Sequence, residues 1–136
     1  MALGDFHSNL DTEFAAVTEL WSPRVVAAAN GQYVKVVKVE GEFVWHAHAE
    51  EDEFFLVRKG TLLIRYRDRP DVTLREGDFH VVPRGVEHTT AAPGECWLVL
   101  IEPAATKHTG DTMSDMTKSI EAQTVHLSGG RSGFSR

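Results

Sequence analysis

Residues 41–60 have the sequence GEFVWHAHAEEDEFFLVRKG, in which short apolar segments surround a pair of histidines and an acidic run. His46 and His48 lie two positions apart, so on a strand both imidazoles point to the same face. The acidic residues 50–53 predict a turn, and EFFLV predicts the returning strand. Glu53 begins that strand, and we therefore expect its carboxylate to face the histidine pair.

Segments with the same period of two recur through the middle of the chain. They are rich in Val, Ile, Phe, Tyr and Trp, and they are QYVKVVKVEG, GEFVWHAH, EFFLVRKG, TLLIRYRD, DVTLREG, DFHVVPRG and ECWLVLIEP. A spacing of about ten residues per segment leaves no room for crossover helices. The sequence therefore predicts an all-β fold, an antiparallel sandwich or barrel.

The two ends of the chain differ from this middle. Apolar residues recur at helical spacing at Leu10, Phe14, Val17 and Trp21, with Asn9 or Asp11 as the N-cap and Pro23 as the stop. We expect an N-terminal helical segment over residues 1–23, a barrel over 24–103 and a C-terminal extension over 104–136. The end of that extension has a flexible composition, and TKSIEAQTV within it is compatible with either a short helix or an edge strand.

Composition excludes several classes of partner and site. The chain has 136 residues, the length of one domain, and a net charge of −6, which argues against nucleic acid and anionic membranes as partners. A single cysteine, Cys96, excludes a disulfide framework and a thiolate zinc site. The start of the chain lacks the features of a secretory signal. We therefore expect a cytoplasmic protein.

A second stretch, GDFHVVPRGVEHTTAA at residues 77–92, supplies another histidine. Its Pro83 and Gly85 predict a tight turn, after which His88 begins a strand. Three neutral imidazoles and one carboxylate, held by strands in a small barrel, suit Fe(II), Mn, Ni, Co, Zn or Cu(II). Asp52 is the rival carboxylate, but its side chain points away from that of Glu53 if the strand has already begun.

The two stretches resemble the two signature motifs of the cupin superfamily. The matching residues are Gly41, His46, His48, Glu53 and Gly60 in the first motif, and Gly77, Pro83, Gly85 and His88 in the second. The chain departs from the pattern in having one residue fewer between Gly41 and His46, and Ala92 where Asn is usual. The resemblance extends over residues 24–103 and is strongest to small single-domain cupins labelled "cupin domain protein" or "mannose-6-phosphate isomerase-like". In that group, Asn usually stands where this chain has His108.

The resemblance implies a fold, a cofactor and a set of ligands. The fold is the double-stranded β-helix, or jelly-roll barrel, here with a short N-terminal helix. The cofactor is a divalent transition metal held by His46, His48, Glu53 and His88, with one or two coordination positions open to water or substrate. The change to Ala92 removes no ligand, but it takes away a hydrogen bond that would orient a barrel strand.

Strand parity predicts which side chains surround the metal. We expect the pocket to be lined by Val44, Phe55, Val57, Tyr66 and Phe79, and to be small and mostly apolar. His80 is interpreted as a hydrogen-bonded wall residue. Trp45 and Phe54 fall on the opposite parity, facing another sheet, the N-terminal helix or a partner subunit, and we therefore expect a homodimer.

These features support two main hypotheses about function. The first is a metal-dependent enzyme acting on a small organic substrate that coordinates at open metal positions, by oxygenase-type or isomerase/lyase-type chemistry. The second is a non-catalytic module that binds a small molecule or a metal. A third, a structural scaffold without metal, predicts no stoichiometric transition metal in the purified protein. The sequence names neither the substrate nor the metal, because fold does not fix function.

Overall fold

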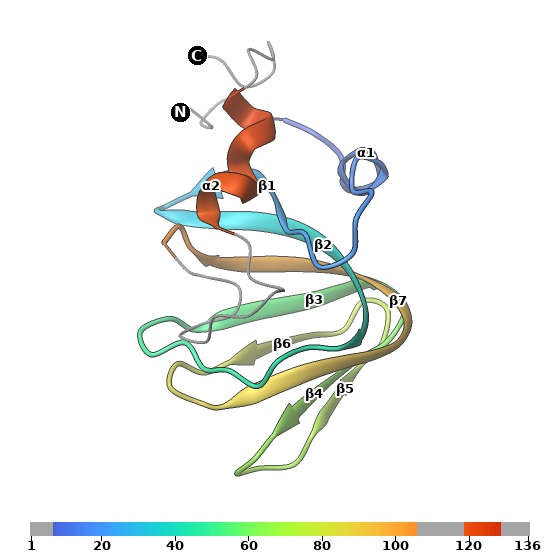
Figure 1. Ribbon diagram of the computed structural model, residues 1–136, viewed down its shortest axis with the longest axis vertical. Helices are drawn as coiled ribbons and strands as arrows, with labels where there is room; N and C mark the ends of the chain where they lie inside the picture. Colours follow the sequence, from blue (N-terminus) through green and yellow to red (C-terminus); the bar gives the residue numbers. More distant parts are fainter. Residues whose placement is uncertain (1–6, 106–118, 129–136) are drawn as a thin grey trace.

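The computed structural model describes residues 7–105 and 119–128, which form an antiparallel barrel with short helices at one end (Figure 1). The strands are β1 (Arg24–Ala29), β2 (Gln32–Glu42), β3 (Glu53–Lys59), β4 (Leu62–Tyr66), β5 (Val72–Leu74), β6 (Phe79–Val82) and β7 (His88–Pro103). The helices are α1 (Leu10–Ala15), α2 (Ile120–Thr124) and the 3₁₀-helix η1 (Val125–Ser128). Every strand pairing in the described part of the chain is antiparallel, which confirms the all-β prediction.

The long strand β7 joins the two sides of the barrel. Residues 96–103 of β7 pair with β2, as do residues 91 and 92 after a register shift, and part of the first stretch also pairs with β3, giving the order β1-β2-β7-β3-β6. Residues 88–91 of β7 pair with β4, which in turn pairs with β5. Because one continuous strand belongs to both sides, the residues around His88 face those on β3 across the interior.

Alternation along the strands places the core inside this barrel. On β3, Glu53, Phe55 and Val57 are buried, whereas the residues between them are only half-buried. Burial of apolar side chains from every side supplies the main stabilisation, at roughly 25 cal/mol per Å² removed from water. The buried core consists of Val37, Val39, Phe55, Val57, Leu62, Ile64, Tyr66, Leu74, Val82, Ala92, Cys96, Leu98 and Leu100.

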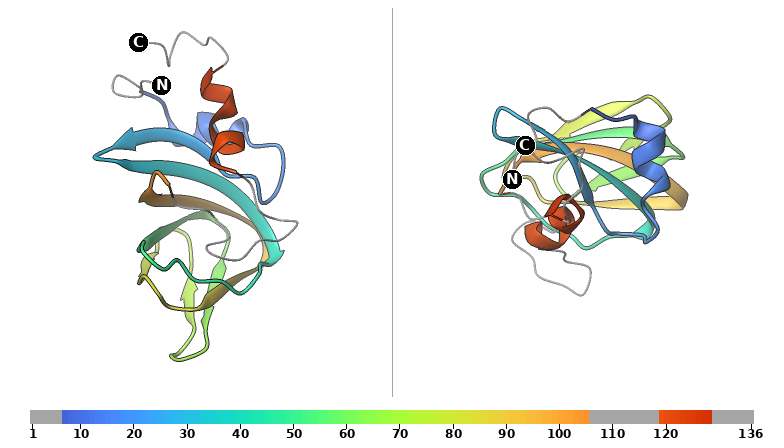
Figure 2. Two further views of the ribbon diagram at one scale, coloured as in Figure 1. Left: turned by 60° about the vertical axis from the view of Figure 1, so that its left-hand side comes forward. Right: turned by 90° about the horizontal axis from the view of Figure 1, so that it is seen from above.

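The N-terminal helix packs on the outside of the barrel. Asn9 accepts a hydrogen bond from the backbone N–H of Asp11 and so caps α1, as the sequence predicted. Phe14 is fully buried and stacks on Trp97 at 5.0 Å between ring centroids. In the views of Figure 2, α1 and α2 both lie beside β1 and β2, and they leave the other end of the barrel uncovered.

The predicted extent of this helix is wrong. The helix ends at Ala15 and does not continue to Trp21. Trp21 has a φ of +60°, outside the helical region, and its N–H donates to the carbonyl of Lys38 at 2.8 Å. Its side chain consequently packs against the interior of the barrel, whereas Phe14 and Val17 pack on the outside.

The C-terminal segment folds back onto β1. Residues 120–124 form a helix, which resolves the alternative that the sequence left open. The imidazole Nε2 of His126 lies 2.8 Å from the carbonyl of Val25, and Leu127 packs against the same residue. His108 and the end of the chain, predicted to be flexible, lie outside the described residues. Within the ranges 7–105 and 119–128, no helix is long and apolar enough to cross a membrane.

Gly60 is the position at which the fold most strictly requires glycine. Its φ is +87°, and an added Cβ would lie 2.7 Å from the carbonyl oxygen of Glu95. We expect Gly60→Ala to lower the free energy of unfolding by about 2 kcal/mol, from backbone strain and this clash. Gly94→Ala, where an added Cβ meets nothing within 4 Å, is the control and is expected to change stability by less than about 0.5 kcal/mol. Urea unfolding of both variants measures the difference, and equal losses would contradict the assignment.

Candidate metal centre

Two backbone hydrogen bonds bring the two histidine motifs together. The N–H of His46 donates to the carbonyl of His88, and the N–H of His88 donates to the carbonyl of His46, both at 2.9 Å. Gly85 in the intervening turn donates to the carbonyl of His48 at 2.7 Å. The expected regular strand through His46 and His48 is reduced to this isolated bridge, because β2 ends at Glu42. The bridge nevertheless fixes the two motifs face to face.

The ring orientations of His46 and His88 are set by their own backbone. Nδ1 of His46 lies 2.9 Å from the carbonyl of Val44, and Nδ1 of His88 lies 3.0 Å from that of Val86. A carbonyl only accepts, so each Nδ1 carries the proton and each Nε2 presents a lone pair. Nε2 of His88 is buried and has no hydrogen-bond partner. Such an orphaned nitrogen is the donor that a metal ligand requires.

Glu53 and His48 complete the cluster. Oε1 of Glu53 lies 3.1 Å from Nε2 of His48 and 3.7 Å from Nε2 of His88. All four side chains are buried, and one ligand atom from each lies within 4.8 Å of the others. The sequence prediction thus named four residues that the structure brings together. Three imidazoles and a carboxylate at this spacing fit a divalent transition metal.

The electrostatics of the cluster follow from its burial. Burial, helped by the nearby His88, lowers the pKa of His46 to about 4, so this imidazole is neutral at neutral pH. Burial also lowers the pKa of His48, but its hydrogen bond with Glu53 and the charge of that carboxylate outweigh burial and raise it. Burial raises the pKa of Glu53, whereas contacts with His48 and His88 prevail and leave it well below its ordinary value. Glu53 is therefore an anion.

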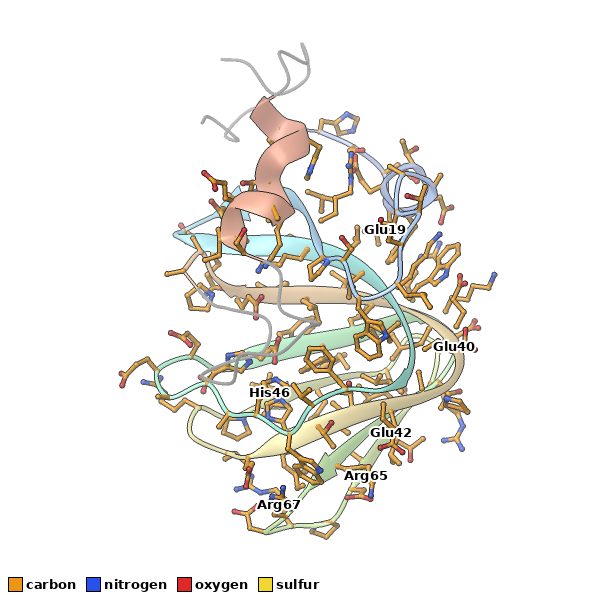
Figure 3. The ribbon with its side chains drawn as sticks, viewed as in Figure 1. Glu19, Glu40, Glu42, His46, Arg65 and Arg67 are labelled. Atoms are coloured by element: carbon orange, nitrogen blue, oxygen red, sulfur yellow. The ribbon has the colours of Figure 1, made fainter. Side chains whose placement is uncertain are left out.

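Other residues weighed from the sequence lie outside this cluster. The carboxylate of Asp52 accepts from the backbone N–H of Arg84 at 2.9 Å, on the surface. His80 shares a 2.7 Å hydrogen bond with the Tyr66 hydroxyl, consistent with a wall residue. Figure 3 shows His46 between the strands of the barrel and Arg65 at the outer edge beside β4. Arg65 on β4 and the following Arg67 and Arg69 have side chains that are 41%, 55% and 42% exposed to solvent.

Sequence reasoning missed a buried ion pair next to the cluster. Nζ of Lys35 lies 2.8 Å from Oε1 of Glu102, and neither side chain is exposed to solvent. Glu102 is also close enough to Glu53 for each carboxyl group to shift the pKa of the other. Burial and the charge of Glu53 raise the pKa of Glu102 to about 8 against the effect of Lys35. The spacing in the sequence could have revealed Lys35, because it lies at intervals of two from Val37 and Val39 and so shares the inward face of the strand with them.

A narrow apolar cavity of about 40 Å³ adjoins the cluster, with room for only a few water molecules. His46 and Glu53 belong both to the cluster and to this cavity. Apart from Thr90, the other lining residues are apolar. The full lining is Trp21, Pro23, Val37, Val39, Phe43, His46, Glu53, Phe55, Thr90, Leu98 and Leu100.

Of the five residues predicted to line the pocket, Phe55 does so. Val44 is outside the lining, Val57 is buried elsewhere in the core, and Tyr66 is buried beside His88 of the cluster, with 6.4 Å between the ring centroids. Phe79 is 66% exposed and stacks on Phe54 on the outer face. The reason is register, since Phe79 pairs with Leu56, whose side chain points outward, whereas its neighbour His80 pairs with the inward Phe55. The parity of β6 could not be fixed from the sequence across the turn at Pro83.

Comparison with known proteins bears on both the fold and the motifs. The family model described as "Cupin domain" matches residues 33–102. A solved cupin-2 domain containing protein from Shewanella frigidimarina is 49% identical, with a TM-score of 0.68. The alignment covers 71% of this chain and 93% of that one. These matches confirm the cupin barrel predicted from the two motifs.

Two further relatives are less informative about function. The uncharacterized protein YdbB of Bacillus subtilis (strain 168) is 34% identical over 65 residues, which are 48% of this chain and 58% of that protein. The chain therefore spans less than two thirds of this curated relative. A structure of the hydroquinone 1,2-dioxygenase PnpCD, in complex with Cd²⁺ and 4-hydroxybenzonitrile, is 19% identical with a TM-score of 0.58, covering 71% of each chain. At that identity the likeness shows the fold alone.

The lowered pKa of His46 makes the stability of the metal-free protein depend on pH. Unfolded, His46 binds a proton below about pH 6.5, whereas in the native state it stays neutral down to about pH 4. Above pH 6.5 His46 is neutral in both states and does not affect the free energy of unfolding. As the pH falls to 4 the unfolded chain binds this proton more strongly than the native state, which lowers the free energy of unfolding by about 3 kcal/mol. We expect His46→Asn to remove this part of the pH dependence in urea unfolding at pH 7 and pH 4. An equal change in the free energy of unfolding between pH 7 and pH 4 in the two proteins would contradict this prediction. His48 has the opposite effect, but it is present in both proteins and therefore cancels in the comparison.

Proposed function

The chain belongs to the cupin family, and on this premise we propose that it is a metal-dependent enzyme acting on a small organic substrate. His46, His48, Glu53 and His88 are the proposed metal ligands. The observation that carries the proposal is the position of His46 and Glu53, which take part in the buried cluster and also line the adjoining cavity. A molecule in that cavity would lie directly beside the metal.

The donor set supports one divalent transition metal, Fe, Mn, Ni, Co, Zn or Cu. Four protein ligands leave one or two positions of such an ion for substrate oxygens. When bound, the metal supplies a Lewis acid and, as Fe(II), a centre that reacts with dioxygen. The protein contributes fixed ring orientations through the Nδ1 hydrogen bonds of His46 and His88 and keeps the carboxylate of Glu53 ionised.

Within this class, the cavity favours an oxygenase over an isomerase or lyase. Isomerisation and elimination move a proton between substrate atoms and need a positioned acid or base. Apart from the proposed ligands, Thr90 is the one residue with a polar side chain among the described residues that line the cavity. A dioxygenase transfers both atoms of O₂ to the substrate, which supplies all four electrons, so no separate reductant is required. The apolar walls suit a compact substrate that coordinates through one or two oxygens.

The state of the protein in solution is a separate proposal. Phe79 is 66% exposed and stacks on the half-buried Phe54 on the outer face of β3 and β6, at 5.7 Å between centroids, and together with the exposed Val81 it supports a homodimer. The light-scattering mass tests this, since a value near 15.1 kDa, that of one chain, would contradict it. The cytoplasmic location stays a prediction.

The decisive experiment joins metal content to turnover. We expect the protein, loaded with Fe(II) without oxygen, to hold one metal per chain and to consume O₂ with catechols, hydroquinones or 1,3-diketones as candidate substrates. Because each removes a ligand, we expect Glu53→Ala and His88→Ala to weaken metal binding by about 100-fold or more. Elemental analysis and an oxygen electrode measure these effects.

The matched control is His80→Gln, which alters a half-buried histidine that is hydrogen-bonded to Tyr66 and is not a proposed ligand. This variant is expected to keep its metal. Stoichiometric metal and ligand binding without conversion of any substrate would replace the enzyme with the non-catalytic binding module. Failure to bind metal even after reconstitution would overturn both and leave the structural scaffold.

A further inference from the structure

We infer that Trp21 is a specificity-determining residue, which limits the size of the molecule that can reach the proposed metal centre. The inference rests on the proposed function, since it concerns access to that same metal. Trp21 lines the cavity together with the proposed ligands His46 and Glu53. It lies outside residues 33–102, the part of the chain that matches the family model, so the N-terminal segment adds this wall to the barrel.

Trp21 is separated from a proposed ligand by a single aromatic ring. Its indole stacks on Phe43 at 4.7 Å between centroids, with the two planes only 8° apart. The edge of Phe43 in turn meets the imidazole of His46, at 5.4 Å and 90°. Parallel stacking followed by an edge-to-face contact is a favourable arrangement of aromatic rings. The three rings therefore lie in contact in sequence, from Trp21 through Phe43 to the proposed ligand His46.

The backbone of Trp21 aims the ring at the cavity. A φ of +60° is uncommon for a residue other than glycine and reverses the direction of the chain between α1 and β1. The N–H of Trp21 is fixed to the carbonyl of Lys38 on β2 at 2.8 Å. The side chain is half-buried, whereas Phe14 in the preceding helix is fully buried on the outer face. Trp21 consequently stands between the cavity and solvent.

Several other walls of the cavity are held in place by the sheet. Val37, Phe55 and Leu100 stand on β2, β3 and β7, which are joined to one another by continuous antiparallel pairing. Trp21, Pro23 and Phe43 lie outside the strands, and Trp21 has the largest side chain of the three. With about 40 Å³ available, room for a few water molecules, a single small ring enters only if a wall shifts, and a second ring needs the space that the indole occupies. Trp21 is therefore the residue that sets the limit.

The test measures size selectivity on the cobalt-loaded protein. Co(II) bound at the four proposed ligands gives visible bands that shift when a further ligand coordinates, and the probes are imidazole and 4-phenylimidazole. We expect the wild-type protein to favour imidazole. We expect Trp21→Ala to bind 4-phenylimidazole at least 10-fold more tightly while its affinity for imidazole changes less than 3-fold. A purely structural role would alter both affinities together and leave their ratio unchanged.

Two further variants complete the design. Trp21→Phe keeps a ring to stack on Phe43 and is expected to give an intermediate gain, which maintains the test if Trp21→Ala does not fold. Trp45→Ala removes an indole that packs under the guanidinium of Arg67 at 4.0 Å, outside the cavity lining, and is expected to leave the ratio unchanged. If Trp21→Ala has normal cobalt bands but an unchanged ratio of the two affinities, the inference is overturned and the proposed function stands. The same outcome in Trp21→Phe has this meaning if the alanine variant does not fold. Absence of cobalt bands in the wild-type protein overturns both.

Discussion

The contact between the carboxylate of Glu53 and the imidazoles of His48 and His88 is the interaction on which the candidate centre depends. An ionised carboxylate inside an apolar barrel is costly unless hydrogen bonds or a cation offset the loss of water. His48 supplies one such bond at 3.1 Å, but Nε2 of His88 has no hydrogen-bond partner. One divalent cation among these atoms would satisfy the orphaned nitrogen and the carboxylate together. Satisfying both at once is the strongest physical argument that the cluster is a metal site.

The buried pair of Lys35 and Glu102 adjoins the cluster. Nζ of Lys35 lies 2.8 Å from Glu102, but burial and the charge of Glu53 raise the pKa of Glu102 to about 8, so at neutral pH this carboxyl group is mostly protonated. Glu102 also lies close to Glu53, which links the buried pair on β2 and β7 to the carboxylate on β3. A chain of contacts of this kind holds a ligand in place from outside the coordination shell.

The N-terminal segment connects the surface of the barrel with its interior. Phe14 anchors α1 on the outer face, and ten residues later β1 enters the sheet at Arg24. Between them the chain turns so that Trp21 packs on the opposite side of the sheet from Phe14. A short segment thus stabilises the fold at one end and shapes the cavity at the other. Extensions of this kind let one barrel serve different ligands without change to its strands.

The sequence by itself determined the all-β fold and named the four residues of the cluster. Period-two alternation and glycine-bounded segments are local features, and the parity that separates Glu53 from Asp52 extends over one residue. Only the tertiary structure decided which side chains meet across the barrel. Phe79 was expected inside and lies outside, because the register of β6 against β3 depends on a turn whose geometry the residue types do not fix. Trp21 and the Lys35–Glu102 pair enter the site for the same reason, since contacts between distant parts of the chain are set by packing and not by local pattern.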